Sequence, residues 1–276
     1  MLFITGAASG IGAAVAREAV GRGYRAVLAD INEPAAKALA DELGSAAIAV
    51  SLDVRNAAGW ESALDAGWNA FGSVDVLVNN AGIVRTGFAQ QLDLAAHREM
   101  MDVNFFGPVT GMKAVIPRFR AQGHGQILNI CSMTAFMPLT GYATYGATKH
   151  ALRVFHHSLA LEERDGPVSF TIVHPPAVQT PMLEQELADE SAFLGFAERA
   201  IDPSVLAESV VDAIKTKPVE LVFPTVMGRV QRAFGVFPRL MRVAIPIAER
   251  TARRHRASLV LGRSEPARQS SAVDRH

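Results

Sequence analysis

The sequence contains a single cysteine in 276 residues, Cys131, so no internal disulfide can form and no cysteine cluster is available for a metal. No run of about eighteen or more apolar residues occurs, which argues against a helix that spans a membrane. The chain also lacks an initial charged segment followed by an apolar core, so no signal peptide is predicted and the cytoplasm is the expected compartment. These absences favour a globular protein without a metal site.

The composition favours one domain of the α/β class. Apolar residues make up 49% of the chain, which is enough to bury a substantial core. Segments with the pattern of strands alternate with segments with the pattern of helices, and this alternation is typical of a parallel sheet covered by helices on both faces. We therefore expect a doubly wound parallel sheet, followed by a helical extension at the C-terminus.

A glycine-rich turn follows the first predicted strand, Leu2 to Thr5, and opens the first predicted helix. Its glycines, Gly6, Gly10 and Gly12, have the spacing G-x-x-x-G-x-G. Glycine is needed where the backbone turns tightly or approaches a ligand closely, and the start of a helix offers N–H groups to a pyrophosphate. A tight turn without a ligand is the alternative. The position after a strand and before a helix favours dinucleotide binding.

A second group of polar residues lies in the middle of the chain. Ser132 follows an apolar run, and Tyr145 and Lys149 are four residues apart in a helical pattern, so their side chains share one face. A tyrosine has a pKa of about 10, and the neighbouring ammonium group is expected to lower the pKa of Tyr145 towards the range of a useful base. The three side chains suit proton transfer to or from an alcohol oxygen. Alone, Y-x-x-x-K also occurs as an exposed pair on an amphipathic helix.

Together these motifs resemble those of the short-chain dehydrogenase/reductase family in its compact form, which has a Rossmann-like fold. The matching residues are Thr5-Gly6-Ala7-Ala8-Ser9-Gly10-Ile11-Gly12, Asn79-Asn80-Ala81-Gly82, Asn104, Ser132, Tyr145 and Lys149. The resemblance covers about residues 1 to 225, taken as the catalytic domain, and implies four catalytic residues, Asn104, Ser132, Tyr145 and Lys149. It implies that a dinucleotide is bound by Gly6, Ser9, Gly10, Ile11, Gly12, Asp30, Asp53, Val54, Asn80, Ala81, Gly82, Tyr145, Lys149, Val178 and Thr180.

Asp30 sets the expected choice of cofactor, because it follows the second predicted strand, Arg25 to Ala29. An acidic residue at this position accepts hydrogen bonds from the adenosine ribose and repels a 2′-phosphate, and no arginine follows it directly. NAD is therefore predicted in preference to NADP. The alternative is a solvated aspartate or a helix cap.

The segment from Leu92 to Arg120 has the pattern of one long helix with Asn104 near its middle. Gly107-Pro108 should disturb its hydrogen bonds, because proline has no N–H to donate. In the family, the matching asparagine supports a water that links the lysine to solvent.

The strand predicted at Val168 to Val173 leads into His174-Pro175-Pro176, where the family usually has Pro-Gly. His174 is predicted to end this strand rather than to act as a base. Because proline fixes φ and glycine does not, the loop beside the nicotinamide is expected to follow a different path.

In relatives the following segment, Met182 to Phe196, covers the substrate; here it mixes acidic residues with apolar ones. An apolar pocket wall is expected from these apolar residues together with Phe136, Met137, Leu139 and Tyr142.

The end of the chain lies outside the resemblance and carries an excess of positive charge. From Arg229 to His276 there are eleven arginines, no lysine and three acidic residues, although the whole chain has a formal net charge of zero. Residues 226–262 are predicted to form a basic amphipathic helical extension, divided at Pro246, and residues 263–276 a disordered tail. The extension either makes a peripheral contact with an anionic membrane or packs on its own subunit or a partner. Nucleic-acid binding is not expected, because the rest of the chain is acidic.

The favoured function is an oxidoreductase that transfers a hydride between NAD and an alcohol or carbonyl group of a small apolar substrate, such as a lipid, sterol or retinoid. Two alternatives remain: an epimerase or dehydratase of the same family, and a dinucleotide-binding regulatory protein without turnover, which the departure at Pro176 keeps open. The resemblance also implies a homodimer or homotetramer assembled through the catalytic helix.

Overall fold

The computed structural model describes residues 1–187, 189, 191 and 200–223. The predicted helical extension (226–262), the predicted disordered tail (263–276) and the end of the predicted substrate-covering segment (192–196) lie outside the described residues. The choice between a membrane contact and a packing role for the extension therefore stays a prediction. None of the described helices combines the length and the apolar character needed to cross a bilayer.

Seven parallel strands form one sheet in the order β3-β2-β1-β4-β5-β6-β7. Their bounds are β1 (Leu2–Thr5), β2 (Ala26–Asp30), β3 (Ala47–Ser51), β4 (Val76–Asn79), β5 (Gly125–Ile130), β6 (Val168–His174) and β7 (Glu220–Val222). The chain starts in the middle of the sheet, proceeds to the β3 edge and then returns to the other side of β1. Ligands of doubly wound sheets bind beyond the carboxyl ends of the strands at such a reversal, here between β1 and β4. The predicted fold class is confirmed.

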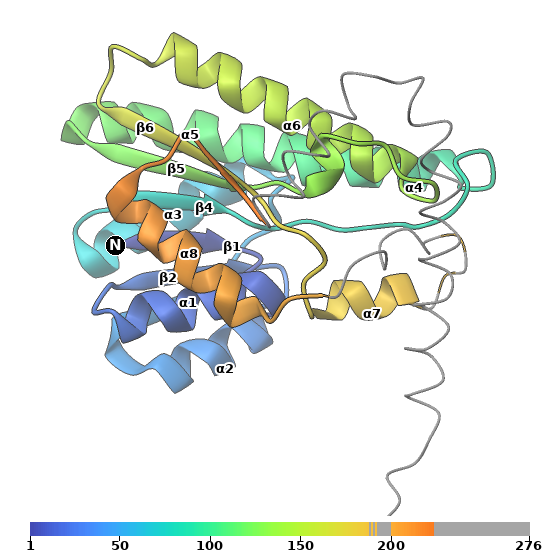
Figure 1. Cartoon of the computed structure of the whole chain (residues 1–276). Coiled ribbons are helices and arrows are strands. Elements are labelled where there is room, and N and C mark those ends of the chain that lie inside the picture. Colours follow the sequence, from blue (N-terminus) through green and yellow to red (C-terminus); the bar gives the residue numbers. More distant parts are fainter. Residues whose placement is uncertain (188, 190, 192–199, 224–276) are drawn as a thin grey trace, which may run out of the picture.

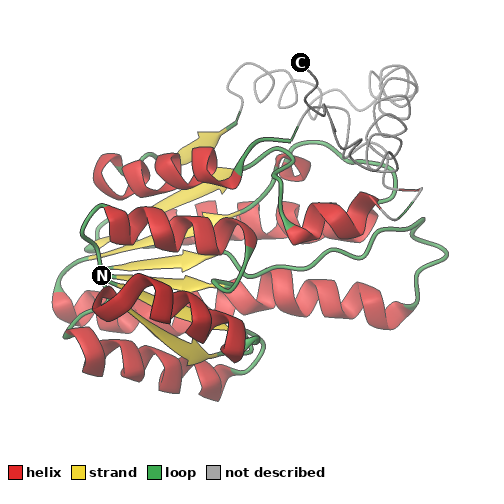
Figure 2. Cartoon of the chain, turned by 90° about the horizontal axis from the view of Figure 1, so that it is seen from below, coloured by secondary structure: helices red, strands yellow, loops and turns green. Residues whose placement is uncertain are grey.

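Helices cover both faces of the sheet (Figures 1 and 2). One face packs against α1 (Gly10–Gly21), α2 (Glu33–Leu43) and α8 (Pro203–Thr216), and the other against α3 (Ala57–Phe71), α5 (Gly107–Gln122) and α6 (Ala143–Glu162). Two shorter helices, α4 (Leu94–Met101) and α7 (Pro181–Leu187), follow the carboxyl ends of β4 and β6. Because both faces of the sheet are covered, the central strands β1, β4 and β5 are buried along their whole length rather than at every second residue.

The packing is closest where α3 meets α5. Trp60 on α3 is fully buried, stacks on Phe3 with the ring centroids 5.8 Å apart, and donates from its indole nitrogen to the carbonyl of Val54 at 2.9 Å. Gly111 on α5 makes room for the indole, since a Cβ atom at that position would lie 2.4 Å from Cη2 of Trp60. The glycine therefore serves packing between the two helices.

The predicted long helix from Leu92 to Arg120 is interrupted near its centre, just before Gly107-Pro108, which was expected to disturb its hydrogen bonds. The chain forms α4, then the π-helical turn η2 (Asp102–Phe106), then α5. The N–H of Gly107 donates to the carbonyl of Asp102, five residues earlier. Pro108 comes next and has no N–H for the carbonyl of Asn104, where an α-helix needs one, and the wider turn accommodates this missing bond. Asn104 is thereby placed, buried, at the middle of an irregular turn.

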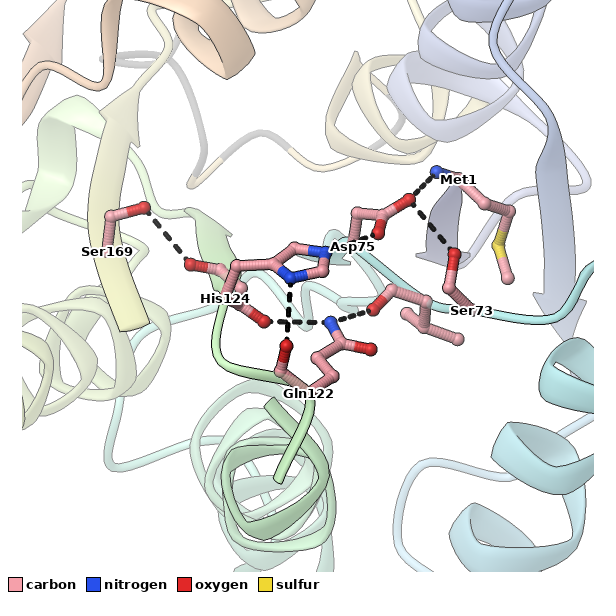
Figure 3. A network of polar contacts seen from close by, with 8 residues as sticks. Met1, Ser73, Asp75, Gln122, His124 and Ser169 are labelled. Carbon is pink, nitrogen blue, oxygen red and sulfur yellow. Dashed lines mark hydrogen bonds and ion pairs between the residues drawn. The ribbon is translucent and has the colours of Figure 1, made fainter. Parts of the chain in front are cut away.

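A polar network ties together the amino ends of the central strands, at the edge opposite the glycine turn (Figure 3). Asp75 contacts the amino group of Met1 and also His124, whose Nε2 lies 2.9 Å from Oδ1. Gln122 donates to the carbonyls of Val74 and His124, both at 2.8 Å. Burial opposes the ionisation of Asp75, but its hydrogen bonds with the Met1 amino group and His124 outweigh it and lower the pKa of this carboxyl group. These contacts stabilise the amino ends of the strands. A functional site is therefore expected at the carboxyl ends.

Candidate active site

The residues that follow β4 fix the conformation of the glycine-rich turn between β1 and α1. Gly6 and Gly10 have φ values of +63° and +54°, in the left-handed region that favours glycine. The side-chain amide of Asn80 donates to the carbonyls of Thr5 and Gly6 at 2.9 and 3.0 Å. In return, Oγ1 of Thr5 accepts the N–H groups of Asn80 and Ala81 at 3.0 and 3.1 Å. The backbone of the turn is therefore fixed by side chains rather than left to its own flexibility.

The start of α1 presents backbone N–H groups with no competing side chain. Ser9 is the N-cap residue but makes no capping hydrogen bond, and no acidic residue occurs in the first turn. Gly12 lies beneath the turn, where a Cβ atom would be 2.3 Å from the carbonyl oxygen of Gly6 and 2.6 Å from Nδ2 of Asn80. The turn can approach the helix this closely only because position 12 is glycine. The result is a helix N-terminus suited to a phosphate group.

Asp30 ends β2 beside this turn. Its Oδ2 accepts the N–H of Ala8 at 2.9 Å, and its Oδ1 accepts the N–H of Asn32 at 2.8 Å. The helix-cap alternative is not realised, because Asn32 caps α2 by accepting the N–H of Ala35 at 3.3 Å. The carboxylate of Asp30 is thus fixed at the edge of the turn, and it also supports the backbone of that turn.

A cleft of about 530 Å³ lies over the carboxyl ends of the central strands. Thirteen of the residues predicted to bind a dinucleotide line it: Gly6, Ser9, Gly10, Ile11, Asp30, Asp53, Val54, Asn80, Ala81, Gly82, Tyr145, Lys149 and Thr180. The remaining two, Gly12 and Val178, do not line it. Gly12 lies beneath the turn, and Val178 is buried where its backbone pairs with that of Ile201.

The cleft also has residues that the motifs did not single out, among them Ile31, Leu52, Arg55, Ile83, Arg85, Glu99, Val103, Pro181 and Gln185. The two arginines are each paired. Arg55 binds Asp53 through two of its nitrogens, at 2.9 and 2.6 Å, and lowers the pKa of that carboxyl group. Arg85 lies 3.1 Å from Glu99. Both arginines lie within three residues of a recognised motif in the sequence, but the sequence does not show which carboxylate each one meets.

Three of the four predicted catalytic residues lie together. Ser132 follows β5 and begins the short helical turn η3 (Met133–Ala135), where its Oγ accepts the N–H of Thr134 at 3.1 Å. Tyr145 and Lys149 lie one turn apart on α6, and the hydroxyl of Ser132 is near enough to that of Tyr145 to act on its pKa. The Nζ atom of Lys149 lies 5.7 Å from the centre of the Tyr145 ring. Two hydroxyl groups are therefore held side by side at the cleft, with an ammonium group near them.

The pKa of Tyr145 is raised in this structure, whereas the sequence predicted that Lys149 would lower it. Burial raises the pKa of Tyr145, the carboxyl group of Glu186 raises it further, and the hydrogen bond with Ser132 acts in the opposite direction. Lys149 is buried too, which lowers its pKa, and its Nζ donates to the carbonyl of Ile130 at 3.1 Å. The prediction that Lys149 brings the pKa of Tyr145 below its ordinary value is therefore wrong for this structure, because desolvation and a nearby carboxyl group outweigh the ammonium group.

Asn104, the fourth predicted residue, joins three elements of the site. Its Oδ1 accepts the N–H of Ile83 and its Nδ2 donates to the carbonyl of the same residue, both at 2.8 Å. The Nδ2 atom also lies 3.3 Å from Oγ1 of Thr148, the neighbour of Lys149 on α6. The side chain thus holds the segment after β4 against the helix that carries Tyr145. The water relay that the resemblance implies stays a prediction.

The substrate side of Tyr145 is apolar only in part. The apolar cluster beside it contains Val84, Leu139, Tyr142 and Met182. Glu186 on α7 approaches the same place, since its Oε2 accepts the hydroxyl of Tyr142 at 3.0 Å, and burial raises its pKa to about 7. Phe136, expected in the apolar wall, instead packs on His174, with the ring centroids 4.4 Å apart. The prediction of an apolar wall therefore omitted a buried carboxyl group.

Comparison with known proteins gives consistent findings. The family model described as short chain dehydrogenase matches residues 1–191. The 3-alpha-(or 20-beta)-hydroxysteroid dehydrogenase of Mycobacterium tuberculosis is 36% identical over 209 residues, which are 76% of this chain and 80% of that protein. The 2,5-dichloro-2,5-cyclohexadiene-1,4-diol dehydrogenase of Sphingobium indicum is 37% identical over 183 residues, 65% of this chain and 73% of that protein. The crystal structure of 3-ketoacyl-(acyl-carrier-protein) reductase from Brucella melitensis, complexed with NADH, matches with a TM-score of 0.74 at 29% identity, over 80% of this chain and 95% of that chain.

Proposed function

The chain belongs to the short-chain dehydrogenase family, and we propose that it transfers a hydride between NAD and the alcohol or carbonyl group of an apolar cyclic substrate. It is an oxidoreductase that acts on CH–OH groups. The observation that carries the proposal is that Tyr145 lines the cleft with Lys149 one helical turn away, while Ser132 lies near enough to act on the pKa of its hydroxyl.

The residues of the cleft fit a nicotinamide dinucleotide. The turn after β1 offers the uncapped N–H groups of α1 to a pyrophosphate, and the absence of acidic residues from the first turn leaves that end positive. Gly82 leaves room beside the catalytic helix, since a Cβ atom there would lie 3.3 Å from Oδ1 of Asn104 and 3.8 Å from Nζ of Lys149. Asp30 supports the choice of NAD, because its carboxylate would repel a 2′-phosphate. Relatives are known with NADH, as in the reductase of Brucella melitensis.

The residues of the chain supply position and proton transfer. When bound, the nicotinamide dinucleotide supplies the hydride chemistry. Tyr145 would take the proton of the substrate hydroxyl during oxidation and return it during reduction. Ser132 would hydrogen-bond the same oxygen, because its hydroxyl already lies against that of Tyr145. Lys149 would add positive charge near the phenol, although its field alone does not overcome the effect of burial.

The substrate class follows from what surrounds Tyr145 and from the relatives. The apolar cluster beside it suits a hydrocarbon ring or chain, and two relatives are named for hydroxysteroid and cyclohexadiene-diol substrates. Cyclic secondary alcohols are therefore the first compounds to test. A useful panel contains cyclohexanol, a 3-hydroxysteroid, retinol and a fatty alcohol, each assayed by NADH formation.

The deciding variant is Tyr145→Phe, which keeps the ring and removes the hydroxyl. We expect turnover to fall on the order of 10²-fold or more while NADH still binds. Tyr24→Phe is the matched control, because Tyr24 packs on the opposite helix layer with α1 and α2. Near-normal turnover in Tyr145→Phe would remove that residue from its role. Product formation without net NADH would indicate the epimerase or dehydratase alternative, and NADH binding with no turnover on any alcohol would indicate a regulatory protein.

We also propose that the chain forms a homodimer or homotetramer through α6, the helix that carries Tyr145 and Lys149. The outward face of α6 has almost no charge; its exposed residues are Ala143, Ala147, His150, Val154, Ser158, Leu161 and Glu162. Val154 and Leu161 are 64% and 65% exposed, and Phe106, just before α5, is 53% exposed. Such a surface suits a second copy of the chain. Light scattering should show a dimer or tetramer that Val154→Lys shifts towards monomer, and a monomeric unmodified protein would contradict the proposal.

A further inference from the structure

Two ionisable residues, His174 and Glu220, lie directly behind the loop that carries Ser132. His174 ends β6 and is fully buried. Its Nδ1 lies 3.0 Å from the carbonyl oxygen of Ser132, and its Nε2 lies 2.9 Å from Oε1 of Glu220 on β7. The imidazole therefore connects the catalytic loop with the outermost strand of the sheet.

Glu220 is held in its charged form. Arg153 on α6 donates from Nε to Oε1 of Glu220 at 3.0 Å, and Nε2 of His157 lies 3.7 Å from the same oxygen. Burial opposes the ionisation of Glu220, but the hydrogen bonds from His174 and Arg153 outweigh it and lower its pKa to about 2. Both ring nitrogens of His174 thus face oxygen atoms, one on the serine backbone and one on Glu220.

We call residues 132–136 the serine loop. His174 and Arg153 also contact the far end of this loop. The ring of Phe136 packs 4.4 Å from that of His174 and 4.7 Å from the guanidinium carbon of Arg153. Between these ends, the N–H of Met133 donates to the carbonyl of Pro175 at 3.0 Å. The serine loop is therefore attached to β6 and its following turn at its start, its middle and its end.

We propose that His174 is a positioning residue for the reaction: it holds the serine loop so that the hydroxyl of Ser132 faces Tyr145, and Glu220 holds His174. The inference rests on the proposed function and extends it to residues outside the recognised motifs. His174 would act through Ser132, whose carbonyl it contacts, and Glu220 would act through His174. A hydrogen-bonded network in a buried place fixes geometry tightly, and small displacements of a catalytic group lower the rate of reaction.

Two substitutions at His174 separate positioning from general stability. In His174→Asn the amide reaches the place of Nδ1 and can still donate to the carbonyl of Ser132, whereas in His174→Gln it reaches the place of Nε2 and cannot. We expect His174→Gln to lower kcat about tenfold, roughly the effect of one buried hydrogen bond, with KM for the alcohol and Kd for NADH within about twofold. His174→Asn should keep most of kcat.

The decisive comparison repeats His174→Gln in a Ser132→Ala protein. Because the hydroxyl to be positioned is then missing, the further loss of kcat should be less than about twofold. An equal loss in both backgrounds, or an unchanged kcat in a folded His174→Gln protein, would overturn the proposal.

A second experiment needs no turnover. Glu220→Gln should speed hydrogen–deuterium exchange in the serine loop. Glu163→Gln is the matched control, since it removes the carboxylate of another ion pair, with Arg120, about 27 Å along α6 from Tyr145. It should lower the melting temperature without changing exchange in the loop. Unchanged exchange in Glu220→Gln would contradict the inference. Faster exchange in a protein that oxidises no alcohol would count against the proposed function alone.

Discussion

Replacing Gly12 by alanine should damage the dinucleotide turn, although alanine is the better helix former. Gly12 is the third residue of α1, and the added Cβ atom would lie 2.3 Å from a backbone carbonyl oxygen, that of Gly6. A backbone atom cannot move aside as the end of a side chain can. Overpacking of this kind costs about 1–3 kcal/mol, and the gain in helix propensity returns about 1 kcal/mol. The net loss of up to about 2 kcal/mol should lower the melting temperature by up to roughly 8 °C.

The same change should weaken the binding of NADH about tenfold or more, because the displaced turn carries the N–H groups that face the phosphates. Fluorescence titration with NADH and thermal unfolding measure the two effects. Gly21→Ala is the matched control: it lies in the same helix, and a Cβ atom there would meet nothing within 4 Å. It should raise stability by up to about 1 kcal/mol and leave binding unchanged. If Gly12→Ala unfolds at the wild-type temperature and binds NADH within twofold of wild type, the reasoning about the turn is refuted.

Three further predictions concern other parts of the molecule. Gly111→Ala should cost about 1–3 kcal/mol in unfolding experiments, because its Cβ atom would lie 2.4 Å from the buried ring of Trp60, and a stability equal to wild type would contradict this. Asp30→Ala should narrow the preference for NAD over NADP in kcat/KM, and better use of NADP by the unmodified protein would overturn the assignment of Asp30. Glu186→Gln removes a charge that raises the pKa of Tyr145, so alcohol oxidation, which needs the deprotonated phenol, should rise with pH at lower values than in wild type; an unmoved or upward-shifted profile would exclude this coupling.

The sequence allowed the sheet and the cofactor side of the site to be predicted well, for local reasons. The first strand was placed at Leu2 to Thr5, as observed, because a short apolar run ends at glycines whose spacing is specific. The residues that determine this strand and its turn are close together in the chain.

Features that depend on distant contacts could not be predicted. The π-helical turn at Asp102–Phe106 has the same apolar spacing over five residues as an α-helix, and only the position of Pro108 hinted at it. The strand Glu220–Val222 has three residues and pairs only with β6, so no periodic pattern marks it. The raised pKa of Tyr145 depends on burial and on Glu186, which follows it by 41 residues. The spacing along α6 showed that Lys149 is close to Tyr145. It could not show the stronger effects of burial and of Glu186 on the pKa of Tyr145.

The amino and carboxyl ends of the strands differ in how their ionisable groups affect the stability of the fold. At the amino ends of the strands, hydrogen bonds lower the pKa of Asp75, so its charge adds to stability above the ordinary pKa of an aspartate, and that contribution is lost as the pH falls through the lowered value. At the carboxyl ends, desolvation lowers the pKa of Lys149 and raises the pKa values of Tyr145 and Glu186, so each charged form is disfavoured there. Such shifts are a cost to folding, and perturbed groups that gather in a cleft are typical of functional sites. Their concentration at one edge, beside the cleft, is therefore a physical argument for catalysis at that place which stands apart from any motif.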